Sequence, residues 1–194
     1  MTAHLRRAVV LALGFLVLLG FVYPLAGTGV VQLLFKHQAN GSLTADGSTL
    51  IGQSWPSPRF FQGRPDASVL TNKPGQVVVS GTEQLGPRSK ELEKLVAERA
   101  ARLRKEGITP TNDLVTNSAS LVDPDISPRS ADAQVAAVAH ANGLPIAAVR
   151  SLVASQVRAK QLGFLGAPYV NVLDLNRALV RLERATHRGA ASGR

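Results

Sequence analysis

The stretch "AVVLALGFLVLLGFVYPLAGTGVVQLLF", residues 8–35, contains no charged side chain over 28 positions. As an α-helix it would extend about 42 Å, whereas the hydrocarbon core of a bilayer is about 30 Å thick. The stretch therefore predicts one transmembrane helix. Pro24 lacks a backbone donor and clashes with the preceding turn, which predicts a kink in this helix.

Two arginines, Arg6 and Arg7, lie in the short tail 1–7 that precedes the apolar run. Basic residues next to a transmembrane helix remain on the cytoplasmic side of the membrane. We therefore expect a single-pass protein with a cytoplasmic N-terminus and with residues 36–194 on the outer side.

A cleaved signal peptide is the alternative interpretation of the same segment. The two arginines would form its basic region, residues 8–21 its apolar region, and "GTG" at 27–29 its cleavage site. The apolar run resumes after that site as "VVQLLF" at 30–35, where a mature N-terminus would normally be polar. The pattern favours a retained anchor, and either interpretation exports the rest of the chain.

The composition fits one domain with an appendage: 194 residues, of which 45% are hydrophobic and 18% charged. There are no cysteines, which excludes disulfides, thiolate metal sites and cysteine nucleophiles. The net charge is +9, and residues 36–194 keep 20 basic against 13 acidic side chains, or +7. The basic residues are scattered and only 5% of residues are aromatic, which argues against nucleic acid as a partner.

Residues 36–194 are predicted to form one α+β domain. Ser89 is a predicted N-cap for a helix that ends near Lys105, with acidic residues in its first turn and basic residues in its last. Gly107 is the predicted stop of this helix. Shorter runs typical of strands lie at 48–55, 59–61 and 76–80.

A second helix is predicted from Ser127-Pro128 to Gly143, because it combines an N-cap, a proline at the first helical position and a terminal glycine. A third is predicted at about 145–160. The alternation of "YVNVLDL", residues 169–175, predicts a strand. Asp174 would then cap a last helix, and 186–194 is expected to fray. The inward side chains of that helix are expected to be Leu175, Leu179 and Leu182.

Motifs for the main classes of catalysis are missing from the sequence. There is no glycine-rich phosphate loop, no Asp-Lys-Thr-Gly string and no "GxSxG" elbow. His140 could serve Ser118 or Ser120 as a base only through folding that the sequence does not reveal. Asp123 and Asp125 could offer oxygens to Ca²⁺, but one alternating pair falls well short of an EF-hand loop.

The stretch "DLVTNSASLVDPDISP", residues 113–128, is rich in hydroxyl and carboxylate groups. Asp123 and Ser127 each precede a proline, which favours extended backbone and side chains that accept from nearby amides. We therefore predict a structural role: a strand at 113–116, a hydroxyl-rich turn and a helix entry.

Six motifs in order resemble the C-subunit family of the Kdp potassium-transporting ATPases, over essentially the whole chain. They are "QANGSL" (38–43), "GSTLIGQSW" (47–55), "FFQGRPDAS" (60–68), "SGTEQLGP" (80–87), "DLVTNSASLVDPDISP" (113–128) and "LGFLGAPYVNVLDLNRAL" (162–179). The resemblance implies a non-catalytic subunit of an ATP-driven K⁺ pump in a bacterial inner membrane. Its expected partners are the lipid bilayer, a channel-like subunit that binds K⁺ and a P-type subunit that hydrolyses ATP.

The family is described as a catalytic chaperone that raises the ATP affinity of the P-type subunit. ATP and K⁺ are therefore expected in the complex, and this chain is expected to hold no catalytic residue, metal or cofactor of its own. The stretch that matches the family's suggested nucleotide contact is "LPIAA", whose residues Leu144, Ile146 and Ala148 lack the family's serine and glutamine. A membrane-anchored exported enzyme and a nucleotide-binding module remain the alternatives.

The resemblance also indicates which residues carry the family motifs and are expected at interfaces. They are Gly52, Gln53, Gly63, Arg64, Pro65, Ser80, Gly81, Asp123, Pro124, Asp125, Gly163, Asn171 and Asn176. The chain departs from the family at "SGTEQ", where "SGGSN" is usual, at Asp125, where His is common, and at Ala167, where Glu is common. If the domain covers the outer mouth of the K⁺-binding subunit, Asp123 and Asp125 would raise the local cation concentration.

Overall fold

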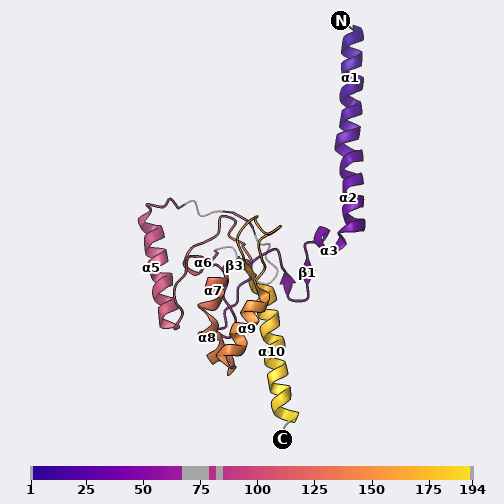
Figure 1. Cartoon of the computed structure of the whole chain (residues 1–194). Helices are drawn as coiled ribbons and strands as arrows, with labels where there is room; N and C mark the ends of the chain where they lie inside the picture. The colour runs from indigo at the N-terminus through magenta and orange to yellow at the C-terminus, as the bar shows by residue number, and fades with distance from the viewer. Residues whose placement is uncertain (1, 67–78, 82–84, 193–194) are drawn as a thin grey trace. The chain divides into compact units, whose positions relative to one another are not determined.

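The computed structural model describes residues 2–66, 79–81 and 85–192 (Figure 1). The chain divides into two compact units, Met1–Leu43 and Thr44–Arg194. The described residues contain helices and two short two-stranded sheets, β1-β2 and β3-β4, joined by turns and irregular segments. The predicted mixture of helices and strands is confirmed, with helices in the majority.

The first unit is dominated by one apolar helical run, formed by α1 (Thr2–Val17), the π-helix η1 (Leu18–Val22) and α2 (Tyr23–Leu34). Residues Ala3–Leu34 are long and apolar enough to cross a membrane, by length and composition. A short helix, α3 (Lys36–Ala39), follows. Strands β1 (Leu43–Thr44) and β2 (Gly47–Ser48) form a small hairpin at the boundary of the two units.

Pro24 lies in the first turn of α2. The helical ribbon is continuous from α1 into α2 (Figure 1). The backbone N–H of Tyr23 bonds to the carbonyl of Leu18, five residues back, instead of four. A proline in a regular α-helix would clash with the carbonyl four residues before it, and the wider π turn relieves this crowding. The helix therefore continues through Pro24 with a π turn where we had predicted a kink.

The main core of the second unit lies between helices α8 (Val135–Asn142), α9 (Ile146–Gln156) and α10 (Val172–Ser192), with β3 (Asp125–Ile126) and β4 (Val170–Asn171) beside them. The strands are antiparallel, and Asp125 is opposite Asn171. The fully buried large side chains of this core include Phe61, Ile126, Val135, Val138, Val149, Val170, Leu175 and Leu179. Each such side chain stabilises the fold by about 1.5–3 kcal/mol relative to an exposed one.

Helix α5 (Lys90–Lys105) confirms the prediction made for it from local signals. The side chain of Ser89 accepts from the backbone N–H of Leu92 at 3.4 Å, and Gly107 adopts a positive φ of 73° just beyond the end. Leu103 packs with a second cluster that includes the short helix α6 (Asn112–Val115). This cluster consists of Leu103, Ile108, Leu114 and Val115.

Several predicted elements are shorter or of another type in the structure. Residues 113–116 lie mostly in helix α6 and form no strand. Ser127 caps α7 (Pro128–Asp132) and Gly143 ends α8 as predicted, but the two helices are separate. The buried side chain of Gln134, at the break, bonds to the backbone of another segment.

The C-terminal part of the chain also differs from the prediction. Only Val170 and Asn171 of the segment 169–175 form a strand, because Val172 already begins α10. The side chain of Asn171, not Asp174, caps this helix by accepting from the backbone N–H of Asp174 at 3.2 Å. Helix α10 then continues to Ser192, through most of the segment that we expected to fray.

The backbone of residues 49–66 forms no strand, although two runs in it were predicted as strands. Asn176 accepts from the N–H of Phe61 at 2.9 Å and donates to its carbonyl at 3.0 Å. Gln134 does the same for Gln62, at 2.7 and 3.0 Å. Two buried amide side chains thus replace a neighbouring strand, since buried backbone groups require partners. Part of the third predicted strand, 76–78, lies outside the described residues.

Candidate functional site

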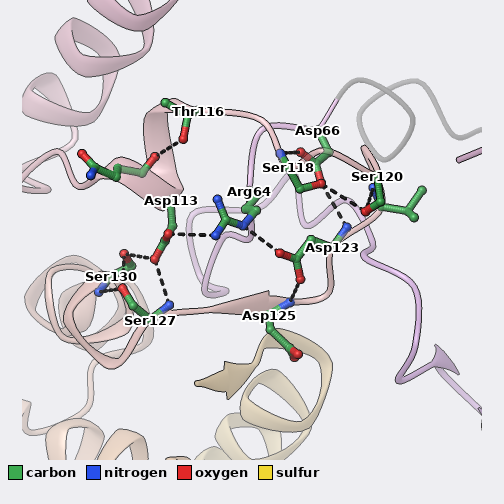
Figure 2. A network of polar contacts seen from close by, with 12 residues as sticks. Arg64, Asp66, Asp113, Thr116, Ser118, Ser120, Asp123, Asp125, Ser127 and Ser130 are labelled. Carbon is green, nitrogen blue, oxygen red and sulfur yellow. Dashed lines mark hydrogen bonds and ion pairs between the residues drawn. The ribbon is translucent and has the colours of Figure 1, made fainter. Parts of the chain in front are cut away.

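Arg64 is the centre of a polar cluster that joins segments far apart in the sequence (Figure 2). Its Nη2 donates to Asp113 Oδ1 at 3.0 Å, and its Nε donates to Asp123 Oδ2 at 2.9 Å. The Arg64 side chain is only 22% exposed, so water screens these pairs less than surface pairs. Arg64 therefore fixes its own segment to helix α6 and to the loop that precedes β3.

Asp113 holds the start of helix α7. Its Oδ2 accepts from the backbone N–H of Ser127 at 2.9 Å and from the hydroxyl of Ser130 at 2.7 Å. Burial alone would raise the pKa of Asp113, but the hydrogen bonds from Ser127 and Ser130 and the charge of Arg64 outweigh it and hold this pKa below its ordinary value. The carboxylate is thus stabilised in its charged form by the fold.

Asp66 is fully buried and accepts three hydrogen bonds (Figure 2). Its Oδ1 accepts from the backbone N–H of Ser118 at 2.6 Å, while its Oδ2 accepts from the Ser118 hydroxyl at 2.6 Å and from the N–H of Asp123 at 3.1 Å. A buried carboxylate is tolerated only with such compensation. Asp66 therefore shapes the hydroxyl-rich turn at 118–123 from the inside.

Asp125 faces a different environment from Asp113. Burial raises the pKa of its carboxyl; the nearby carboxylates of Asp123 and Asp174 raise it further, and the opposing effects of Asn171 and Arg158 do not cancel this. Its Oδ1 accepts from the amide of Asn171 at 2.8 Å, across the β3-β4 pair. The folded environment therefore disfavours the charged form of the Asp125 carboxyl.

Six of the motif residues line one small hollow, of about 10 Å³, beside this cluster. They are Gly52, Gln53, Gly63, Arg64, Asp123 and Pro124. Gln53 fits closely over Gly47, whose φ is +124° and where an added Cβ would lie only 2.1 Å from the Gln53 amide nitrogen. Glycine is therefore required at position 47. The hollow itself, at about 10 Å³, has room for no ligand larger than a water molecule.

The remaining motif residues are distributed around the domain. The hydroxyl of Ser80 and the N–H of Gly81 both donate to the carbonyl of Ser120, at 3.2 and 3.0 Å. Pro65 is buried next to Asp66, and Asn171 and Asn176 bond to backbone groups elsewhere in the domain. Gly163 lies in an exposed loop, apart from the cluster. The motif departures at 82–84 fall outside the described residues.

The expected nucleotide contact, residues 144–148, is at the start of helix α9. Leu144 is only 7% exposed and belongs to the main core, so its side chain does not reach the surface. Ile146 is 48% exposed and Ala148 is half-buried. The residue before the helix is Pro145, which supplies no side-chain cap and no backbone donor. Nucleotide contact here stays a prediction.

The structure separates the groups that a serine hydrolase would require. The Ser118 hydroxyl donates to Asp66, and Ser120 lies in the same turn. His140 is exposed in α8 and lines a different hollow. Among the described residues no group of three or more His, Asp or Glu side chains is placed to hold a metal ion. The oxygens of Asp123, proposed for Ca²⁺ or for attracting K⁺, are occupied by Arg64 and by the N–H of Asp125.

A larger groove, of about 770 Å³, lies between α5, α8 and the segment 53–65. Its wall includes the tilted ring pair Trp55–Phe60, with centroids 5.1 Å apart, and the apolar side chains of Leu103 and Ile108. Sequence reasoning missed this groove, because its walls come from three distant segments. It also gave Asp66 no role, although this residue lies inside the quoted motif "FFQGRPDAS".

Comparison with known proteins places the chain in a family. Residues 5–181 match the family model described as KdpC, the c chain of the K⁺-transporting ATPase. A relative from Sorangium cellulosum is 47% identical, over 92% of this chain and 98% of its own length. Relatives from Caulobacter vibrioides and Methylobacterium nodulans are 46% and 44% identical, over 92% and 94% of this chain and 93% and 98% of their own lengths.

All three relatives bear the name "Potassium-transporting ATPase KdpC subunit". The matched region includes the apolar N-terminal helix as well as the domain with the Arg64 cluster. The resemblance noted from the six motifs is thereby confirmed. The chain belongs to the KdpC family of potassium-transporting ATPase subunits.

Proposed function

We propose that this chain is the non-catalytic, membrane-anchored subunit that stabilises an assembled K⁺ pump. Its partners in this proposal are a K⁺-binding, channel-like subunit and a P-type subunit that hydrolyses ATP. The match over residues 5–181 to a family of pump subunits carries the proposal. The polar cluster supports it, because the carboxylates of Asp66, Asp113 and Asp123 each accept from donors of the domain itself.

In this proposal the run Ala3–Leu34 crosses a bacterial inner membrane, with Arg6 and Arg7 on the cytoplasmic side and the domain outside. ATP is cytoplasmic, so a hydrocarbon layer of about 30 Å would separate it from the domain. A catalytic chaperone that raises the ATP affinity of the P-type subunit must then act through contacts between membrane helices. The burial of Leu144 agrees with this indirect route.

Affinity purification of the tagged full-length chain in mild detergent tests the assembly. We expect two larger membrane proteins to co-elute and the eluate to show K⁺-stimulated ATP hydrolysis. Recovery of the chain alone, from membranes that do contain the pump, would contradict the proposal. Equilibrium dialysis of labelled ATP with the purified chain distinguishes this proposal from a nucleotide-binding module. A nucleotide-binding module should bind ATP more tightly than millimolar, whereas the proposed subunit should not.

Two further measurements test the topology and the chaperone role. Protease added to cells with a permeabilised outer membrane should digest the domain, whereas closed inverted vesicles should protect it; the reverse pattern would overturn the orientation. Membranes that lack the chain should need several-fold more ATP for half-maximal hydrolysis than membranes that contain it. An unchanged ATP requirement, with assembly intact, would remove the chaperone role alone.

A further inference from the structure

The loop between α9 and β4, residues 158–169, is ordered by its own backbone. Arg158 and Tyr169 exchange two backbone hydrogen bonds at its base, of 2.8 and 3.1 Å, and Gln161 and Leu165 exchange two more, of 3.0 and 2.9 Å. The Arg158 guanidinium pairs with Asp174 and lies 5.9 Å from the centre of the Tyr169 ring. We call this segment the 158–169 loop.

The tip of the 158–169 loop is apolar and exposed. Leu162 is 83% exposed, Phe164 is 71% exposed and Leu165 is 47% exposed. Three large apolar side chains in four consecutive positions form a patch, in contrast to the scattered single exposures that are normal on a protein surface. Contiguous apolar patches of this kind mark interaction sites.

The backbone of the tip adopts conformations that are costly for one of these residues. Leu162 has a φ of +51°, a conformation that costs an L-residue with a side chain about 1–2 kcal/mol, whereas Gly163 and Gly166 adopt positive φ without this cost. The leucine gains no burial in return. Strain of this kind is concentrated at sites that act on something outside the chain.

The chemistry of the 158–169 loop argues for a protein partner over lipid or a second copy. Loops and helices that bind lipid use a rim of basic residues, whereas Arg158 is already paired with Asp174 and leaves only Lys160. Three such side chains expose an apolar surface area on the order of 400 Å². This is about half of the area that each partner buries in a standard stable interface. The tip therefore suits an anchor within a larger interface and is too small for a dimer of its own.

We infer that the 158–169 loop inserts Leu162, Phe164 and Leu165 into an apolar crevice on another subunit of the same pump, with an acidic group at its rim facing Lys160. The inference rests on the proposed function and names the element of the chain that makes the contact. Fully buried apolar anchors of this kind contribute most of the binding energy of an interface. The rigid loop also reduces the entropy lost on binding, because it is ordered beforehand.

The test replaces Phe164 in the tagged full-length chain, co-expressed with the other pump subunits. Phe164→Asp should reduce co-elution of those subunits at least tenfold, while thermal unfolding of the chain, followed by circular dichroism, is unchanged. Leu50→Asp is the matched control, because Leu50 is 58% exposed in the turn after β2 and an acidic residue is readily accommodated in a turn. This control should assemble normally.

The result distinguishes the two proposals. If the wild-type chain brings down no subunits, the proposed function fails; if Phe164→Asp brings down as much as wild type, only the loop contact fails. A photo-crosslinking residue at position 164 gives a second readout. It should form an adduct with one of the larger subunits, and an adduct with lipid, or with a second copy of this chain, would overturn the inference.

Discussion

The Arg64 cluster and the 158–169 loop reverse the usual distribution of polar and apolar side chains. In the cluster, carboxylates lie inside the domain, and Asp66 is fully buried. In the loop, two leucines and a phenylalanine lie outside, with Leu162 83% exposed. Both regions contribute residues to the motifs that identified the family, such as Arg64 and Gly163.

The two regions differ in whether their groups are satisfied within the chain. Each cluster carboxylate accepts hydrogen bonds from the chain's own donors, so these bonds stabilise the fold of the domain itself. The apolar tip of the loop contacts water, and its favourable energy is realised only when another surface covers it. Mutations in the cluster should therefore change stability, and mutations in the loop should change assembly.

The largest expected effect is the loss of Asp66. Asp66→Ala leaves two partly buried backbone N–H groups and the Ser118 hydroxyl without their acceptor, which should lower the free energy of unfolding by about 3–5 kcal/mol. For a chain of this size the melting temperature should fall by about 10 °C.

The control is Asp132→Ala, which removes an exposed ion pair with Arg150 and should cost less than about 1 kcal/mol. Thermal unfolding in detergent, followed by circular dichroism, measures both variants. Equal melting temperatures for the two variants would show that the cluster does not stabilise the domain, and the comparison would fail.

A smaller effect is expected in the pH dependence of stability. The pKa of Asp113 is lowered, so its contribution is present above the unfolded value of 3.8 and is lost as the pH falls through the lower folded pKa. The pKa of Asp125 is raised, so its contribution is present below 3.8 and is lost as the pH rises through the higher folded pKa.

Melting temperatures measured between pH 3 and pH 7 test both signs. Asp113→Asn should lower stability near neutral pH and remove part of the loss below pH 3.8. Asp125→Asn can still accept a hydrogen bond from Asn171. This variant should lose less of its melting temperature than wild type as the pH rises above 3.8. If the melting temperatures of both variants change with pH as that of wild type does, the fold does not favour the charged form of Asp113 or disfavour that of Asp125.

The smallest effect is expected in the loop. Leu162→Gly removes strain of about 1–2 kcal/mol, from which the greater freedom of glycine in the unfolded chain subtracts about 0.5–1 kcal/mol. The side chain is 83% exposed, so almost no burial is lost, and the melting temperature should rise by about 1–2 °C. Assembly with the pump should weaken at the same time. A fall in melting temperature would mean that Leu162 is structural, and the contrast between the two regions would disappear.

The elements predicted correctly are those encoded by neighbouring residues. Helix α5 follows from Ser89, the charges of its first and last turns and Gly107, all of which act within a few positions. The elements predicted wrongly depend on partners elsewhere. Residues 59–61 have the composition of a strand, but their backbone pairs with Asn176, 115 positions away from Phe61, instead of with another strand.

The candidate site shows the same limit. The six motifs identified the family and named Arg64 and Asp123, but they could not indicate that these two residues form an ion pair across 59 positions. Asp66 was given no role, because its neighbours in the sequence do not distinguish it from a surface residue. Its burial and its hydrogen bonds to Ser118 and Asp123 reveal that role.

The sequence by itself determined the apolar run at 8–35, the local helix signals and the membership of the family, because hydropathy, capping and motif identity are properties of neighbouring residues. Only the tertiary structure decided that Asp113 and Asp123 of the hydroxyl-rich stretch pair with Arg64 and that the tip at 162–165 is exposed. The physical reason is that burial and hydrogen bonding depend on which distant segments meet. Contacts between distant segments form only when the whole chain folds.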